Sequence, residues 1–494
     1  MKTNFCFLAL SSLSWAFAQS PLPADSATLL QGIEVSAQKA PPPTGSASAG
    51  YRVDTLSYGL LGEAEAQKTP YALQAVSGEQ ISNQGSHDML SALKTVPTVA
   101  ATRSPNTDQR GLSNTMIRGF VPNYLLDGMA INGYQMPLVE NVERMEVLNG
   151  FSSFFYGFSS FGGTINFVSK QPLQEAMASV TLGRHTGEVD FVHADLGGPV
   201  DRQKKFCYRV NAFKESGQTY IHGQSEENGL YAINLGYHLL PTTELRVDAY
   251  HQDYLTQGQQ TVFKVNPSKG INVPDADIMD PTVLYGQPWT YTTMQFTQIG
   301  VGLESQLGKY FRVRGAYRYG FGLWQYNYIL SSFTDNAGNY SETDYNYGSQ
   351  RRFYRAGYGM LDAKIATGPI LHKITTGYTG DATMIHFGDS ADATVALGTS
   401  NVSDPTSYSE PDGFDTLNDP HYQYNRYFDH TILIGDRLNW KDRVELMIGL
   451  SENISQTIRT TGNLSESGSS RFTQKKLSPS GALTVTPWKP VSTY

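Results

Sequence analysis

The sequence is poor in charge, poor in cysteine and without a long apolar run. Charged residues make up 17% of the 494 positions, and no stretch beyond the first twenty residues approaches the ~20 unbroken apolar residues of a membrane-spanning helix. The net charge of -8 and the lack of a basic run argue against nucleic acid as a partner. Because Cys6 lies in a segment expected to be removed, Cys207 would stand alone, so no internal disulfide is expected.

Catalytic signatures are also missing. The sequence has no Gly-x-Ser-x-Gly elbow, no His-Glu-x-x-His and no phosphate-binding loop, so the chain is not expected to be an enzyme. It has instead 47 Gly, 30 Tyr and 23 Phe. This balance suits a β-rich chain with many turns and bands of aromatic residues.

The first eighteen residues have the three parts of a signal peptide. Lys2 gives a positive start, residues 5–17 form an apolar run, and Ala16-Phe17-Ala18 is a small-x-small cleavage signal. We predict that residues 1–18 are removed; a buried N-terminal helix is the alternative. Residues 19–50 are rich in Pro, Ala and Ser and are expected to be extended and flexible.

Residues 51–172 are predicted to be a small α+β domain. A turn at residues 77–81 leads into a predicted helix that continues through Met89 and Leu93 and ends at Pro97. Short strands separated by turns are predicted to follow it, at residues 114–117, 124–126, 144–148 and 164–168.

From residue 173 onward the apolar residues recur with a period of two. Residues 231–239 and 245–249 alternate on either side of a Pro-Thr-Thr turn, which predicts two antiparallel strands. The same pattern recurs at residues 299–303, 311–317 and 444–450. Very short turns alternate with long polar loops, residues 252–289 and 389–422 being the longest, as in outer-membrane barrels.

Charge predicts which face of these strands is wet. Arg312, Arg314 and Arg318 share one parity, opposite Phe311 and Tyr317. An Arg on a lipid-facing side near the bilayer centre costs about 2–4 kcal/mol, so the arginines are predicted to point into a polar interior. A soluble β-sandwich also alternates and is the alternative.

Five motifs in the α+β domain follow one another in a fixed order and spacing. They are Met116-Ile117-Arg118-Gly119-Phe120, Leu125-Leu126-Asp127-Gly128, residues 141–150, Ser152-Ser153-Phe154-Phe155-Tyr156-Gly157 and residues 162–172. Together they closely resemble the plug domain of TonB-dependent siderophore receptors. The chain departs from the family pattern at Phe151 and Phe161, where prolines are usual, and in the short region between Gly119 and Tyr124.

The resemblance implies a mainly β fold, with an N-terminal α+β plug domain inside an antiparallel transmembrane β-barrel of about 22 strands. Residues 173–494 would supply part of that barrel. The chain shows only about a dozen strand signals there and ends within one. Because an unclosed barrel would leave backbone unpaired in lipid, we expect a fragment or truncated product.

The resemblance also implies a function and partners. The chain would be a monomer in the outer-membrane lipid of a Gram-negative bacterium and would import a ferric siderophore, which is the transported ligand; no resident cofactor or metal is expected. Energy would come from TonB and its inner-membrane complex. The TonB box would be the alternating island Ile33-Glu34-Val35-Ser36-Ala37, which could add as a strand to a sheet of TonB; a disordered linker is the alternative.

Two sets of site residues follow from the resemblance. Arg118, Glu143 and Arg144 match a lock between plug and barrel, in which buried charges must be paired; solvated surface charges are the alternative. The predicted siderophore-binding residues are Arg103, Tyr134, Gln135, Trp289, Tyr291, Trp324 and Tyr326. The last four could instead belong to an aromatic girdle.

Two other functions remain open. One is TonB-dependent import of another cargo, such as cobalamin or a glycan. The other, from a different class, is a secreted β-rich binding protein or enzyme.

Overall fold

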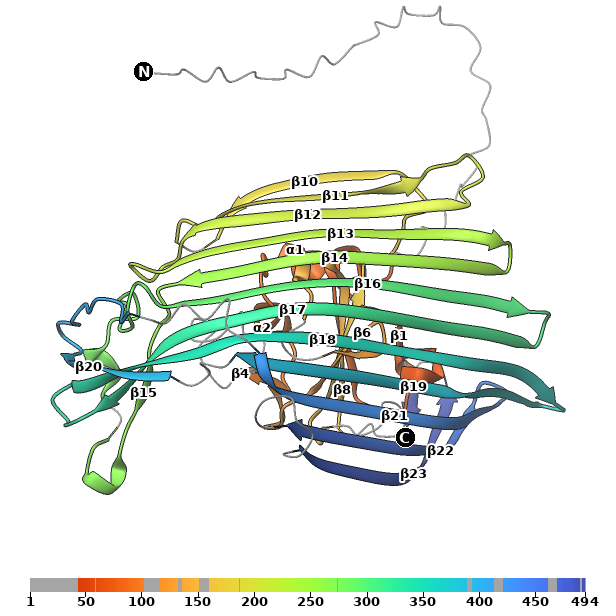
Figure 1. Ribbon diagram of the computed structural model, residues 1–494. Helices are drawn as coiled ribbons and strands as arrows, with labels where there is room; N and C mark the ends of the chain where they lie inside the picture. Colours follow the sequence, from red (N-terminus) through yellow and green to blue (C-terminus); the bar gives the residue numbers. More distant parts are fainter. Residues whose placement is uncertain are drawn as a thin grey trace, which may run out of the picture. The chain divides into compact units, whose positions relative to one another are not determined.

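The computed structural model describes residues 43–57, 59–101, 115–131, 136–150, 160–185, 187–272, 274–388, 393–412, 421–460, 469–488 and 491–493. They form an inner domain (residues 43–172) and a wall of long strands (residues 173–493), shown in Figure 1. The predicted signal peptide and residues 33–37 lie outside the described residues. Within the described ranges, no helix is long and apolar enough to cross a membrane.

The inner domain is built on a five-stranded sheet with the strand order β3-β8-β9-β6-β7. Its strands are β3 (Leu73–Ser77), β6 (Asn123–Leu126), β7 (Met129–Ile131), β8 (Val142–Asn149) and β9 (Gly163–Ser169). Two pairs of short strands flank it, β1 (Thr55–Ser57) with β2 (Glu63–Glu65) and β4 (Val99–Ala101) with β5 (Thr115–Ile117). Helices α1 (Gly78–Asn83) and α2 (Met89–Leu93) complete the domain. The predicted α+β domain and its four strands are therefore confirmed, while β1, β2, β3, β4 and β7 were not foreseen.

The single helix predicted through residues 77–93 is wrong, because the structure has two. Gly85 takes a left-handed backbone conformation with φ of 60° and ends the first helix. Asp88 then starts the second with a capping box, in which its side chain accepts from the backbone N–H of Ser91 and the Ser91 side chain bonds back. In the sequence, Gly85 and the N-cap residue Asp88 were the signals for a break.

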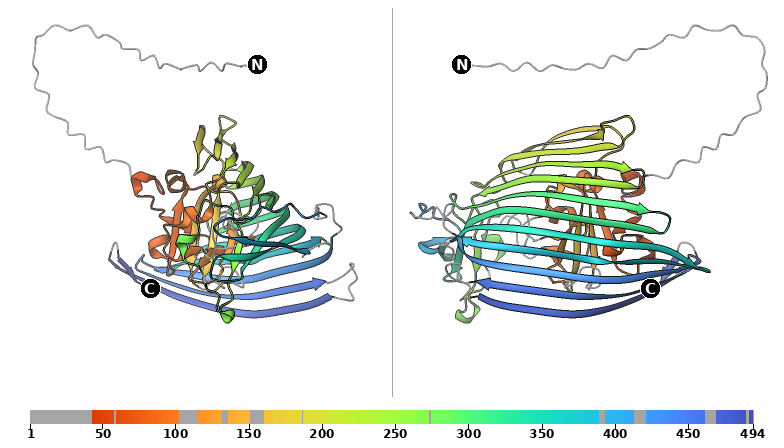
Figure 2. Two further views of the ribbon diagram at one scale, coloured as in Figure 1. Left: turned by 90° about the vertical axis from the view of Figure 1, so that its left-hand side faces the viewer. Right: turned by 45° about the vertical axis from the view of Figure 1, so that its right-hand side comes forward.

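The wall is one large antiparallel sheet whose consecutive strands are hairpin neighbours. Its long strands are β10 (Met177–Arg184), β11 (Asp190–Pro199), β12 (Phe206–Gln218), β13 (Ser225–Leu240), β14 (Thr243–Gln257), β16 (Tyr291–Leu307), β17 (Phe311–Phe333), β18 (Asn339–Thr367), β19 (Ile370–Gly388), β21 (His421–Trp440), β22 (Val444–Thr460), β23 (Ser469–Trp488) and the short β24 (Val491–Thr493). Figure 2 shows that these strands curve around the inner domain as an open trough. Among the described residues, no pairing joins β10 to the far end of the sheet.

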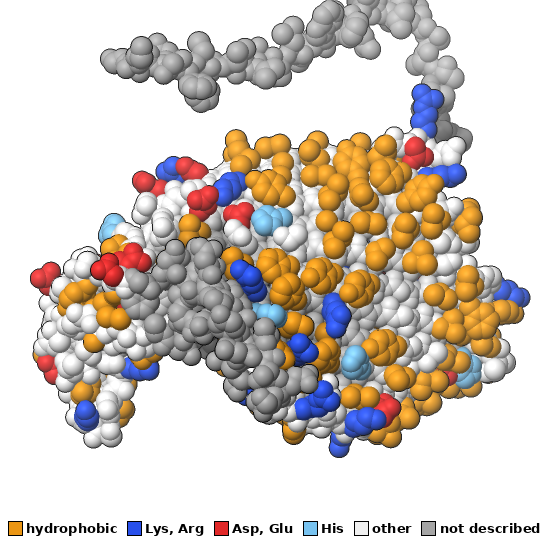
Figure 3. All heavy atoms as spheres, viewed as in Figure 1, with side chains coloured by type: hydrophobic (Ala, Val, Ile, Leu, Met, Phe, Trp, Pro, Cys, Tyr) orange, Lys and Arg blue, Asp and Glu red, His pale blue; other side chains and the backbone are white. Residues whose placement is uncertain are grey.

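The two faces of the wall differ as predicted. Arg314 and Arg318 point into the trough and bond to the inner domain, whereas Tyr317 and Tyr319 on the opposite parity are 49% and 42% exposed. Figure 3 shows hydrophobic side chains spread over much of the outer face, with a few cations among them. The mainly β fold with a polar interior and an apolar exterior is therefore confirmed, and the soluble sandwich is wrong.

Two segments predicted as irregular contain structure. In the first long loop β14 extends to Gln257, and β15 (Val262–Lys264) pairs with β17. In the second, β20 (Ala393–Asn401) pairs with the extended end of β18. These strands form because β17 and β18 project far enough to offer backbone edges to pair with.

The end of the predicted flexible segment is also folded. Gly45 has a positive φ of 77°, and its carbonyl accepts a hydrogen bond of 2.6 Å from the Ser77 hydroxyl. Ser46 caps a short 3-10 turn, Ala47–Ala49. The residues from Pro43 onward therefore belong to the inner domain, because local caps and the Ser77 contact replace hydration of their backbone.

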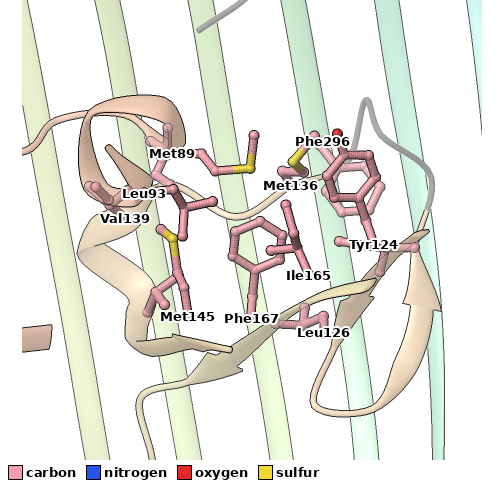
Figure 4. Packing of buried hydrophobic residues seen from close by; sticks show 14 of the residues in the cluster. Met89, Leu93, Tyr124, Leu126, Met136, Val139, Met145, Ile165, Phe167 and Phe296 are labelled. Carbon is pink, nitrogen blue, oxygen red and sulfur yellow. The ribbon is translucent and has the colours of Figure 1, made fainter. Parts of the chain in front are cut away.

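The hydrophobic core of the inner domain runs into the wall. Figure 4 shows Met145, Ile165 and Phe167 beneath the helices, with Phe296 of β16 facing the same cluster. Ile165 and Phe167 are fully buried, and Phe296 is 1% exposed. The inner domain is therefore held in place by shared apolar packing as well as by polar contacts.

Gly163 tests how tightly β8 and β9 pack. A Cβ at this position would lie 2.0 Å from the carbonyl oxygen of Leu148, and the φ of 137° is unsuited to other residues. We expect Gly163→Ala to lower the free energy of unfolding by about 2 kcal/mol or more, measured by denaturant unfolding in detergent. The control is Gly359→Ala on β18, where a Cβ would meet nothing within 4 Å. An equal loss in both variants would contradict this account.

Candidate functional site

A tight hairpin turn places Asp127 at the boundary between the inner domain and the wall. β6 and β7 are joined by Asp127 and Gly128, both with positive φ (48° and 78°), as an Asp-Gly hairpin turn requires. The Asp127 carboxylate accepts from the backbone N–H and the hydroxyl of Ser169, at 2.8 and 2.7 Å. The turn and Ser169 therefore hold the carboxylate in one orientation.

Arg318 of β17 meets this carboxylate from the wall. Its guanidinium donates to Asp127 at 2.5 Å and to the carbonyl of Leu126 at 2.8 Å, and Asp248 of β14 lies 3.3 Å away. Burial alone would raise the pKa of Asp127, but the charge and hydrogen bonds of Arg318, with those of Ser169, outweigh it and hold this pKa below its usual 3.8. The pair is therefore ionised at neutral pH and bridges domain and wall.

A second charged bridge joins the inner domain to β11 and β12. Lys170 donates to Asp195 at 2.8 Å and to Asn211 at 2.9 Å. Arg209 donates two hydrogen bonds to Asp195 and a third, of 2.9 Å, to Glu143 of the inner domain. Burial holds the pKa of Lys170 below its usual 10.5, although Asp195 partly offsets the effect. Each charge in the bridge is thus paired, as burial requires.

Inside the domain, Glu146 connects the first strand to the Asp127 turn. This carboxylate, 2% exposed, accepts from Ser57 N–H at 3.1 Å, Arg144 at 2.8 Å and Asn166 at 2.8 Å. The Asn166 side-chain oxygen in turn accepts from the N–H of Gly128. A continuous chain of hydrogen bonds therefore runs from β1 to the residues that hold Arg318.

A cavity of about 530 Å³ lies between the inner domain and strands β14, β16 and β17. Its lining includes Asp127 and Arg318 together with Arg314, Arg144 and Glu304. Arg314 closes part of it by donating to the carbonyl of Leu60 at 2.6 Å while it is paired with Asp362. The space beside the bridge is thus polar and charged on both sides.

The three predicted lock residues are placed differently. Glu143 reaches the wall through Arg209. Arg144 pairs with Glu146 at 2.8 Å and lies 3.8 Å from Glu63, both in the inner domain, and Arg118 is exposed. A bridge that the sequence analysis did not predict uses Asp127 and Arg318, with the carboxylate on the domain and the arginine on the wall. Two features of the sequence could have indicated this bridge: the Asp-Gly turn, and the position of Arg318 on the side of its strand that was predicted to face the interior.

An aromatic row lines the trough at the end away from the short turns. The rings of Trp324, Tyr326, Tyr328 and Tyr345 stack in sequence, with centroids 4.4, 5.8 and 5.5 Å apart. The Arg352 guanidinium lies 5.0 Å from the Trp324 ring centroid, a distance suited to a cation–π contact. Two of the predicted binding residues, Trp324 and Tyr326, therefore lie together on the lumenal face.

The other predicted binding residues are not in this row. Thr292 is the cross-strand partner of Tyr326, so its neighbour Tyr291 points to the opposite face of the sheet. Trp289 donates from its indole N–H to the carbonyl of Tyr408, 2.9 Å away in the loop that follows β20. Arg103, Tyr134 and Gln135 lie outside the described residues. In the part of the chain that is described, no group of three His, Cys, Asp or Glu side chains could hold a metal ion.

Comparison with known proteins accounts for this architecture. Residues 65–164 match the family model of the TonB-dependent receptor plug domain. Most of the inner domain thus resembles this plug, and we call the domain the plug. Its β6–β7 turn, Glu143 and four of the five core strands lie within the matched residues, whereas most of β9 and Lys170 lie just beyond them.

Relatives extend the similarity to the wall. The ferrichrome receptor FcuA of Yersinia enterocolitica is 24% identical over 452 residues, covering 88% of this chain and 57% of that protein. The chain thus spans a little over half the length of this relative. The ferric preacinetobactin receptor BauA of Acinetobacter baumannii has a TM-score of 0.79 at 19% identity, over 89% of this chain and 65% of BauA. The ferripyoverdine receptor of Pseudomonas aeruginosa has a TM-score of 0.72 at 16% identity, over 87% and 57%. These likenesses establish the fold, a plug seated in the wall of a β-barrel.

Asp127→Asn tests the bridge, because Asn tolerates the positive φ of the turn and removes only the charge. The substitution leaves buried Arg318 with Asp248 as its remaining carboxylate. We expect the plug to be destabilised by about 3 kcal/mol, measured by denaturant unfolding and by protease release of the plug. The control, Asp190→Asn, breaks the solvent-exposed pair with Arg184 and should leave the free energy of unfolding nearly unchanged. An unchanged plug in Asp127→Asn would refute the bridge.

The same pair predicts an acid dependence. The pKa of Asp127 is lower in the folded protein than its usual 3.8. The ionised Asp127 therefore adds its full contribution to the free energy of unfolding above pH 3.8, and this contribution is lost as the pH falls through the folded pKa. The stability difference between the unsubstituted chain and Asp127→Asn should therefore be constant near neutral pH and shrink below about pH 4. A difference that does not change with pH would contradict the assignment.

Proposed function

We propose that the chain acts in TonB-dependent import of a ferric siderophore across the outer membrane of a Gram-negative bacterium, as a transporter and not as an enzyme. The observation that supports this most directly is the plug domain seated against the polar face of a wall whose other face is apolar. Relatives described as receptors for ferrichrome, preacinetobactin and pyoverdine share the fold. The siderophore is the cargo and supplies its own iron ligands.

The bridge suggests how force would act in this proposal. TonB would pair with residues 33–37 and pull on the segment that leads to β1. A pull on β1 would first strip the Ser57 N–H from Glu146 and then disturb Asn166 and Gly128. This would loosen the turn that holds Asp127 against Arg318 and open the adjoining cavity. Glu143 with Arg209 and Lys170 with Asp195 would hold the other side.

The aromatic row is the proposed contact for the cargo at the outer mouth. Flat aromatic faces provide rigid apolar area, and the Arg352 cation suits electron-rich oxygens of an iron chelate. Trp324 and Tyr326 therefore stay in the proposal, together with Arg103, Tyr134 and Gln135 on the plug. Import of cobalamin or a glycan remains the second candidate and is an outcome of the test below.

The test is a binding titration of the purified chain, folded in detergent, with a ferric trihydroxamate. We expect saturable quenching of tryptophan fluorescence, because the iron chelate would lie near Trp324. Arg352→Gln should weaken binding about threefold to thirtyfold, since a cation–π and charge contact is lost.

Trp440→Phe is the matched control for Trp324→Phe. Trp440 is 47% exposed at the opposite, short-turn end of β21, so its loss should leave the quenching intact, whereas loss of Trp324 should remove most of it. Ferric chelates that leave the signal unchanged, with cobalamin or a glycan changing it, would refute the ferric cargo.

A further inference from the structure

Two aspartates face one another on the lumenal side of the wall. Asp381 of β19 and Asp429 of β21 are direct cross-strand partners. Thr383 and Thr431, two residues further along the same strands, are 7% and 4% exposed on the lumenal side, so both aspartates point the same way. Like charges placed directly opposite one another destabilise a sheet. The arrangement therefore calls for a compensating partner.

In the described part of the wall, Ser455 donates a hydrogen bond to Asp429 and His430 lies near it, but no Lys or Arg forms an ion pair with either aspartate. The lumenal arginines nearby are committed elsewhere, Arg318 to Asp127 and Asp248 and Arg352 to Gln350 and the Trp324 ring. One carboxylate oxygen of Asp429 is buried and has no hydrogen-bond partner. A buried acceptor left in this state costs free energy that an incoming donor would recover.

A third polar group lies beside the pair. Tyr354 of β18 is 1% exposed, and its hydroxyl has no hydrogen-bond partner. Tyr354 pairs with Thr383, and Ala356 pairs with Asp381. Tyr354 and Asp381 are therefore diagonal neighbours on one face, a separation that an aromatic side chain spans. Two carboxylates and a phenol thus converge without a donor that satisfies them all.

We propose that Asp381, Asp429 and Tyr354 form a subsite for a primary ammonium group carried by the ferric chelate. An ammonium has three N–H donors and no acceptor, which matches two carboxylates and one phenolic oxygen. Its charge also relieves the repulsion between the aspartates. The inference rests on the proposed import of a ferric siderophore and narrows its cargo to chelates with a cationic arm.

The subsite is within reach of the aromatic row. Arg352 pairs with Ile385, and Ala356 pairs with Asp381, so the subsite lies about 13 Å further along the strands than Arg352. A chelate held against Trp324 would extend a flexible amine arm to this depth. The aromatic row would then hold the iron complex, and the aspartates would select the arm.

The experiment compares two ligands on the unsubstituted chain in detergent. One is a linear ferric trihydroxamate that ends in a primary amine, and the other is the same molecule with the amine acetylated. We expect the amine form to bind about tenfold to one-hundredfold more tightly, because a charge-assisted contact is lost on acetylation. Quenching of tryptophan fluorescence gives both affinities.

The outcomes separate the two proposals. Equal affinities would overturn the subsite and leave the proposed function standing. Binding of neither ligand would overturn the proposed function and the subsite with it. Because this comparison needs no variant, it decides the matter even if substitutions in the wall impair folding.

Variants then test whether the two aspartates cause the preference for the amine form over the acetylated form. Asp381→Asn and Asp429→Asn should lower the affinity for the amine form to that of the acetylated form and leave the latter unchanged. Asp190→Asn makes the same chemical change at an exposed pair and should keep the full preference. Retention of the preference in both lumenal variants would overturn the assignment.

Discussion

A buried arginine must find a negative charge, and in this protein that requirement ties the plug to the wall. Arg318 is 4% exposed in the middle of β17, where its guanidinium would be costly without partners. The partner comes from the plug: Asp127, in a turn whose backbone and Ser169 fix its direction. The apolar cluster around Phe167 and Phe296 joins the same two surfaces, so the cluster and the pair support one another.

In the Asp127–Arg318 bridge, the carboxylate lies on the plug and the arginine lies on the wall, so a movement of the plug can separate the two. The carboxylate belongs to the plug, and the same hairpin is connected through Gly128, Asn166 and Glu146 to Ser57 in the first strand. In our proposal, a pull on the N-terminal side of the plug reaches the buried pair along these hydrogen bonds.

The kinds of side chain that line the lumen change along its length. Near the short turns, it is lined by paired charges such as Arg314 and Asp362. Farther along, the acid pair Asp381 and Asp429 and then the aromatic row follow. In our proposal this gradient orders the passage of cargo, with ring stacking at the mouth, charge selection below it and a gated, charged cavity at the plug.

The sequence by itself determined the mainly β class, the plug domain and the inward parity of the wall arginines, because period-two patterning and motif spacing are local properties. It also pointed to Trp324 and Tyr326. It did not determine that Asp127 meets Arg318, that Arg144 stays within the plug, or that Tyr291 faces away from Tyr326. Those facts depend on register and on domain docking between residues almost two hundred positions apart, and only the tertiary structure decides which distant charges become neighbours.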